Sequence, residues 1–201
     1  MKNISLRLLP VFLVLLFAFT SPNEPLAIGS AIPKADTKLK DISGKEISLK
    51  ESMKPGGLLV MFSCNTCPVV KKYQTRTLES ARDAGSRNIG VVLINSNEAY
   101  REKGDGYADM QSYAKEQGYD FNYLLDRNAE MADLFGAMRT PEVFLFDGKG
   151  LLVYHGAIDD NPNAADEVTR RHLAIALEEL AAGKEVSTRK TRSVGCGIKR
   201  P

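Results

Sequence analysis

Short apolar runs alternate with amphipathic stretches along most of the chain. Residues 58–62 and 89–94 are continuous apolar runs, which are typical of strands buried on both faces. A third run, residues 121–125, predicts another strand. The helical periodicity around these runs predicts four helices, at about residues 63–85, 107–117, 129–135 and 164–182.

Two further stretches carry the signature of hairpins. In the first, apolar positions between residues 39 and 49 flank a turn at residues 41–45. In the second, apolar residues 143–146 and 151–154 flank the turn sequence Asp-Gly-Lys-Gly. Strands that alternate with helices, followed by a hairpin and a last helix, predict an α/β fold with a central mixed sheet covered on both faces.

The N-terminus has the pattern of a secretory signal. Lys2 and Arg7 precede about a dozen apolar residues, 8–19, which is short for a permanent membrane span. The sequence Ala18-Phe19-Thr20 is a poor cleavage site, so an uncleaved anchor is the alternative to a removed signal peptide. Either way we expect an extracytoplasmic protein, periplasmic or secreted, with no membrane contact beyond this anchor, in an oxidising compartment.

The pattern divides the chain into four parts. Residues 1–20 are the signal or anchor, and residues 21–35 are rich in Pro, Gly and Ser and predict a linker. Residues 36–183 form the predicted domain. Residues 184–201 carry six basic side chains and one acidic side chain, which favours a solvated basic tail.

Composition excludes several classes of protein. With 201 residues the chain has room for one ordinary domain, and a net charge of +2 is too small to suggest a partner nucleic acid. There is no second long apolar run, repeat or low-complexity tract, so polytopic membrane and solenoid proteins are excluded. Three cysteines are too few for a fold built on disulfides, and their odd number leaves one thiol over.

The candidate chemistry lies where the first buried strand meets the first helix. Cys64 and Cys67 form a C-x-x-C motif there. Unpaired N–H groups at a helix N-terminus stabilise a thiolate, so we expect Cys64 to be the attacking thiol. Cys67 would be the more buried, resolving thiol, and exchange would proceed through a mixed disulfide.

Thr140 and Pro141 precede the strand predicted at residues 143–146. A cis peptide bond here would expose the backbone of Thr140 beside the thiols, ready to pair with an extended substrate segment. Only about 5–6% of X-Pro bonds are cis, so spacing alone favours a trans turn proline.

These motifs resemble the thioredoxin superfamily. Within its redoxin (AhpC/TSA-like) branch, Cys-Asn-Thr-Cys-Pro, Thr-Pro-Glu-Val-Phe and the terminal Gly-Cys-Gly-Ile-Lys are similar to a peroxiredoxin-like subgroup with a thioredoxin-type C-x-x-C. The resemblance implies a thioredoxin-like fold with an N-terminal hairpin extension and a cis peptide at Thr140-Pro141. It also implies a thiol–disulfide oxidoreductase that uses Cys64 and Cys67, needs no cofactor, and acts on a protein or small-molecule disulfide or dithiol partner.

Other interpretations stay open at this point. A thiol peroxidase with Cys64 as peroxidatic cysteine is one, although neither reading frame of the peroxiredoxin pattern supplies its Thr or Ser: Met61 stands there when counted from Cys64, and Cys64 itself when counted from Cys67. A soft copper site of Cys64, Cys67 and His155 is a weaker one, and we expect no bound metal. Cys196 is either an incidental tail residue or an accessory thiol, since the Gly-Cys-Gly sequence would let it reach Cys64.

Overall fold

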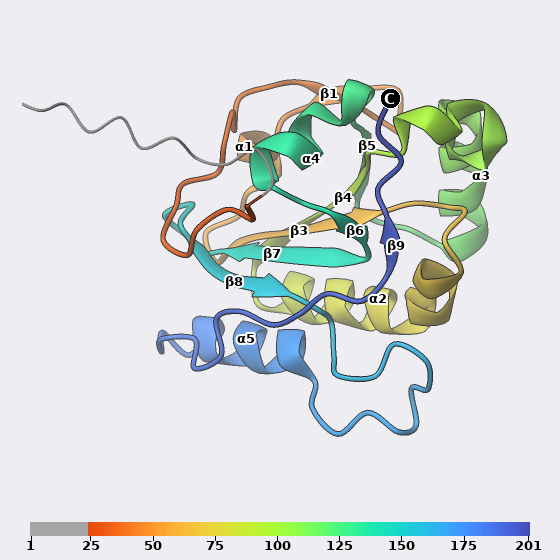
Figure 1. Cartoon of the computed structure of the whole chain (residues 1–201). Coiled ribbons are helices and arrows are strands. Elements are labelled where there is room, and N and C mark those ends of the chain that lie inside the picture. The colour runs from red at the N-terminus through yellow and green to blue at the C-terminus, as the bar shows by residue number, and fades with distance from the viewer. Residues whose placement is uncertain (1–23) are drawn as a thin grey trace, which may run out of the picture.

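The computed structural model describes residues 24–201, so the predicted leader and the first three linker residues lie outside the described part. A seven-stranded sheet with the order β2-β1-β5-β4-β3-β7-β8 forms the centre of the molecule (Figure 1). Its strands are β1 (Leu39–Asp41), β2 (Glu46–Ile47), β3 (Gly57–Ser63), β4 (Ile89–Asn95), β5 (Asn122–Leu125), β7 (Glu142–Phe146) and β8 (Leu152–Gly156).

The three predicted apolar runs are the parallel centre of this sheet. Strand β4 lies between β3 and β5 and runs parallel to both, and β7 pairs antiparallel with the other edge of β3. All seven residues of β3 are buried, which explains why its sequence shows no alternation. Both predicted hairpins are confirmed, as β1–β2 and β7–β8.

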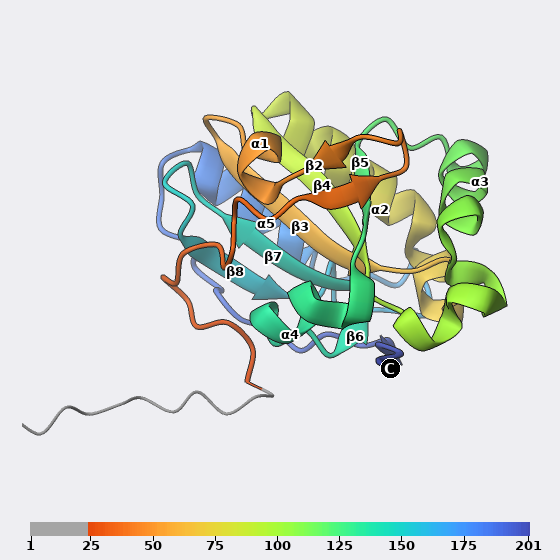
Figure 2. The same cartoon turned by 90° about the horizontal axis from the view of Figure 1, so that it is seen from above.

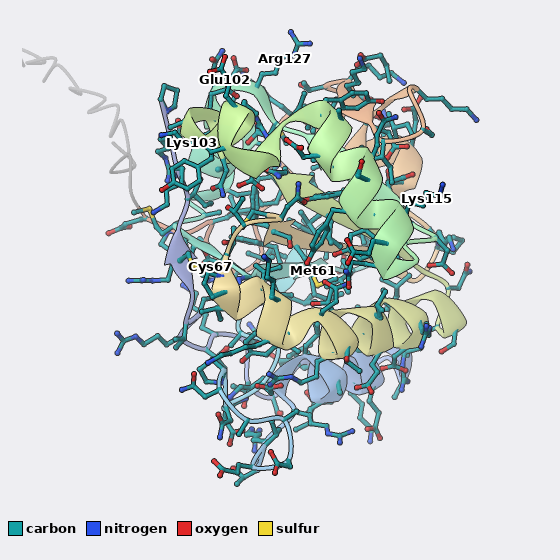
Figure 3. The ribbon with its side chains drawn as sticks, turned by 90° about the vertical axis from the view of Figure 1, so that its right-hand side faces the viewer. Met61, Cys67, Glu102, Lys103, Lys115 and Arg127 are labelled. Carbon is teal, nitrogen blue, oxygen red and sulfur yellow. A yellow bond between two sulfur atoms is a disulfide. The ribbon has the colours of Figure 1, made fainter. Side chains whose placement is uncertain are left out.

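Helices cover both faces of the sheet, as predicted (Figure 2). One apolar core contains residues of α2, α3 and α5, and the other contains residues of α1 and α4. In Figure 3, Met61 lies in the interior next to α2, in the first of these cores. The helices are α1 (Leu49–Ser52), α2 (Pro68–Ser86), α3 (Tyr107–Gln117), α4 (Glu130–Phe135) and α5 (His172–Ala181); none within residues 24–201 is long and apolar enough to cross a membrane.

The last helix is shorter than its sequence suggests. Residues 164–171, predicted as helix, form a bend and a turn within irregular chain instead, and α5 begins at His172. Side chains just before this stretch compete for its backbone: Asn161 accepts from the N–H of Ala164, and Asp160 accepts from the N–H of Thr169. Such local side-chain acceptors offer the backbone an alternative to helical hydrogen bonds.

The tail is packed against the domain, so the expectation of a solvated tail is wrong. The N–H of His155 donates to the carbonyl of Arg189, and the N–H of Thr191 donates to the carbonyl of His155, which extends the β8 edge of the sheet. Further along, Ser193 and Ile198 are buried. A separate two-stranded sheet pairs β6 (Arg139–Thr140) with β9 (Cys196–Gly197), near the C-terminus (Figure 1).

Candidate active site

The C-x-x-C motif occupies the loop between β3 and α2. Strand β3 ends at Ser63, and Cys67 is the N-cap residue of α2, with Pro68 in the first turn where its missing N–H does no harm. Figure 3 shows Cys67 at this end of α2, beside the C-terminal segment. Helix α2 therefore begins at Pro68 and not at about residue 63 as expected, and Cys64 precedes the N-cap by three residues.

Cys64 is a buried thiol. Its side chain has no exposed surface, whereas that of Cys67 is 3% exposed, so the prediction that Cys67 is the more buried of the two is wrong. Its sulfur lies 3.3 Å from the hydroxyl oxygen of Thr140. Burial raises the pKa of Cys64, and the charge of Asp105 raises it further, against the lowering effect of the Thr140 hydroxyl and nearby backbone N–H groups. This environment therefore favours the protonated thiol of Cys64 and not the stabilised thiolate that the sequence predicted.

The buried carboxylate of Asp105 holds the loop between the two cysteines. It accepts from the backbone N–H of Asn65 and from the hydroxyl of Thr66, both at 2.7 Å. The side-chain amides of Asn95 and Asn97 donate to it at 2.9 and 3.0 Å. We refer to these five residues as the Asp105 network. All four donors are satisfied by one charged acceptor, which fixes the loop without a covalent link.

Sequence reasoning missed Asp105, which lies between the strand predicted at residues 89–94 and the helix predicted at residues 107–117. It ends an irregular π-helical turn, η2 (Arg101–Asp105), in which Gly104 adopts a φ of +103° that favours glycine. A signal was present, because β3 and β4 are parallel. Residues that follow the carboxyl ends of neighbouring parallel strands meet at the same edge, so polar residues after β4 were expected neighbours of Cys64.

Thr140 and Pro141 approach the thiols from a different part of the chain. The peptide bond between them is cis, as the family resemblance implied and spacing alone did not. The carbonyl oxygen of Thr140 lies 3.5 Å from the sulfur of Cys67, whereas its side-chain hydroxyl contacts the sulfur of Cys64. The two predicted substrate-binding residues and the two predicted catalytic thiols are thus brought together.

Cys196 joins this group through a disulfide. The structure links Cys67 to Cys196, with their Cα atoms 6.0 Å apart, and leaves Cys64 as the free thiol. Cys196 also stands opposite Thr140 in the antiparallel pairing of strands β6 and β9. The pair expected to form a disulfide, Cys64 with Cys67, is therefore not the one joined here, and the leftover thiol of the sequence lies at the site.

His155 lies away from the thiols, in a buried pair with Glu142. Its Nε2 is 2.8 Å from the Glu142 carboxylate, and its ring stacks on Phe144. Burial opposes ionisation of Glu142, but His155 and the N–H groups of Met138 and Arg139 lower the pKa of its carboxyl below the ordinary value. Within residues 24–201 no three His, Cys, Asp or Glu side chains are grouped to hold a metal, which removes the support for a copper site of Cys64, Cys67 and His155.

Comparison with known proteins identifies the family of the chain. Residues 28–155 match the AhpC/TSA family. The chain belongs to this family. Two solved structures are 33% identical to it: a conserved protein from Geobacillus kaustophilus has a TM-score of 0.81, with 87% of this chain and 93% of that chain covered, and a protein from Sinorhizobium meliloti 1021 has a TM-score of 0.80, with 89% and 97% covered.

A more distant structure shares only the fold with this chain. The thioredoxin domain of a thiol-disulfide oxidoreductase from Bacteroides vulgatus has a TM-score of 0.54 at 20% identity, with 65% of this chain and 88% of that chain covered, and shares the fold. No curated protein matches the sequence. The fold is thus thioredoxin-like, as predicted, and family and fold together indicate an oxidoreductase of the thioredoxin type.

Proposed function

We propose that this protein is an exported thiol–disulfide oxidoreductase that uses Cys64 and Cys67 as its redox pair. The observation that carries the proposal is the convergence of three cysteines on Thr140: Cys64 at its hydroxyl, Cys67 at its carbonyl and Cys196 across the strand pair. Thiols gathered at the start of a helix, beside a backbone edge able to pair with an extended chain, fit disulfide exchange better than metal binding.

The exchange follows from the two thiols of the reduced centre. The Cys64 thiolate attacks a disulfide of the partner, whose S–S bond breaks as a Cys64–partner bond forms. Cys67 then attacks the Cys64 sulfur, so that a Cys64–Cys67 disulfide forms and the partner leaves as a dithiol. Two electrons pass from the protein to a protein or small-molecule disulfide, and the reverse sequence oxidises a dithiol.

The test compares three forms of the purified protein in the reduction of insulin disulfides by dithiothreitol. We expect Cys64→Ser to reduce the rate to that of the uncatalysed reaction, because the attacking sulfur is gone. We expect Cys67→Ser to accumulate covalent partners through Cys64, which can be identified after purification from the native host. Insulin reduction by Cys64→Ser at the wild-type rate would contradict the proposal.

Membership of the AhpC/TSA family makes peroxide the second candidate acceptor. This sequence lacks a Thr or Ser at the position where the peroxiredoxin pattern has one, but the hydroxyl of Thr140 lies 3.3 Å from the Cys64 sulfur and could take that role. Stopped-flow measurement of Cys64 oxidation by hydrogen peroxide separates the two functions. Oxidation no faster than that of a free thiol excludes the peroxidase, and rapid oxidation coupled to turnover supports it.

Export is part of the proposal and rests on the leader, residues 1–20. Fractionation of native cells should place the protein outside the cytoplasm, either released or attached to the membrane by an uncleaved leader. N-terminal sequencing of the mature protein decides between the two forms, and recovery in the cytoplasm would contradict export.

A further inference from the structure

The C-terminal segment, which we define as residues 190–198, lies on the edge that an extended substrate would use. Strand β9 runs antiparallel to β6, with Cys196 opposite Thr140 and Gly197 opposite Arg139. The N–H of Ile198 donates to the carbonyl of Met138 at 3.0 Å. An exposed strand edge binds extended peptides through these backbone groups. The chain therefore holds its own segment, with a cysteine in it, in the place of a substrate.

The glycine before Cys196 is fitted to this edge. A Cβ atom added to Gly195 would stand 2.1 Å from the carbonyl oxygen of Thr140, a distance that no side chain allows. A Cβ atom added to Gly197, on the other side of Cys196, would meet nothing within 4 Å. The backbone thus approaches closely at one glycine and not at the other, which indicates that the segment is adapted to Thr140.

We propose that Cys196 is the third catalytic thiol of the centre, and that one disulfide moves between Cys67–Cys196 and Cys64–Cys67. In the first state the C-terminal segment covers the Thr140 edge, and Cys64 and Cys67 are buried beneath it. In the second state Cys196 is free, and β9 can open to admit an extended partner. The proposal rests on the proposed function, because it assigns that exchange a closed state and an open state.

The step that connects the two states is balanced within the protein. Cys64 loses its proton to solvent, and its thiolate attacks the sulfur of Cys67. The Cys67–Cys196 bond breaks as the Cys64–Cys67 bond forms, and Cys196 leaves as a thiolate that takes up a proton. No external oxidant or reductant is consumed, since one disulfide replaces another.

Both ends of the C-terminal segment are held, so Cys196 stays close when β9 opens. Upstream, the hydroxyl of Thr191 accepts from the N–H of Ala157 at 2.9 Å. Downstream, the N–H of Lys199 donates to the side-chain oxygen of Asn97 at 2.9 Å, and its carbonyl accepts from the N–H of Ala99. A tethered thiol has a high effective concentration, which makes closure by Cys196 faster than capture by a thiol in solution.

Gly195→Ala and Gly197→Ala form a matched pair for the test. Each variant and the wild type is equilibrated in glutathione redox buffer, quenched with acid, alkylated in two steps, and analysed by peptide mass spectrometry. We expect both disulfides in the wild type. Gly195→Ala should shift their ratio toward Cys64–Cys67 by about tenfold or more, because overpacking disfavours the closed state, whereas Gly197→Ala should keep the wild-type ratio. Circular dichroism checks that both variants are folded.

Three outcomes overturn the proposal. The first is a free Cys196 thiol at every redox poise, and the second is Cys67–Cys196 as the sole disulfide even in the wild type, in which Cys64 is present. The third is an equal ratio of the two disulfides in folded Gly195→Ala and Gly197→Ala. The disulfides mapped in the wild type test the proposal even if Gly195→Ala fails to fold. Failure of the proposed function is a different result, namely both disulfides mapped but no insulin reduction. Normal Cys64-dependent insulin reduction with Cys196 always free defeats this proposal alone.

Discussion

The loop from Cys64 to Cys67 is held from two sides by different types of interaction. On one side the Asp105 network binds Asn65 and Thr66 through a buried carboxylate whose donors are all satisfied. On the other side the C-terminal segment is held at both ends by hydrogen bonds, and at the thiols by the two-residue pairing of β9 with β6 and one disulfide. A satisfied buried network is costly to open, whereas a short strand and an exchangeable bond are not.

The difference indicates that the two sides have different roles around the thiols. The Asp105 network keeps the loop in one conformation, and the C-terminal segment controls access to it. Asn97 connects the two, since its amide N–H donates to Asp105 and its oxygen accepts from Lys199. A change on one side can therefore reach the other without passing through the thiols.

The largest effect is expected from Asp105→Ala, which leaves four donors without their acceptor. We expect the free energy of unfolding of the reduced protein to fall by roughly 3–5 kcal/mol. Urea titration measures it. The matched control is Asp109→Ala: this carboxylate caps α3 through Gly106 in an exposed position, and its loss should cost about 1 kcal/mol. Equal losses for the two variants would show that the Asp105 network does not hold the loop.

The next effect concerns the disulfide and depends on redox conditions. In oxidised protein, Cys196→Ser removes a link between residues 129 positions apart and should lower the free energy of unfolding by about 2–5 kcal/mol. With dithiothreitol the wild type and the variant should agree within about 1 kcal/mol, because the link is then absent from both. Identical urea midpoints under oxidising conditions would mean that the bond does not form in solution.

A smaller effect separates the charge of Asp105 from its hydrogen bonds. Asp105→Asn removes the negative charge that raises the pKa of Cys64. In a Cys67→Ser, Cys196→Ser background the pKa of Cys64 should therefore fall, and thiolate absorbance at about 240 nm should appear at lower pH. A pKa that is unchanged or higher would show that the charge does not act on the thiol.

The smallest effect tests the link between Glu142 and the Thr140 edge. The pKa of Glu142 lies below its ordinary value of 4.5 in the folded protein. Its stabilising contribution is complete above that ordinary value and is lost as the pH falls through the folded value. Glu142→Gln should therefore lose less stability than the wild type across this acid range in urea titrations. If the free energies of unfolding of the wild type and Glu142→Gln change in parallel with pH, the lowered pKa of Glu142 is contradicted.

Much of the fold could be predicted because its elements have strong local patterns. The buried runs that became β3, β4 and β5 were evident, and helix α3 was predicted with its observed bounds. Helix α5 was predicted too long, because Asp160 and Asn161 accept hydrogen bonds from the N–H groups of Thr169 and Ala164, and apolar periodicity does not reveal these contacts.

By itself, the sequence determined the chemistry: a C-x-x-C motif at a strand–helix junction, a Thr-Pro before the last hairpin and one cysteine left over. Only the tertiary structure decided which sulfur meets which. Cys67 and Cys196 are 129 positions apart, and Asp105 reaches the loop from η2, which follows the neighbouring strand β4. The physical reason is that spacing encodes contacts within one element, whereas contacts between elements follow from how the sheet arranges them.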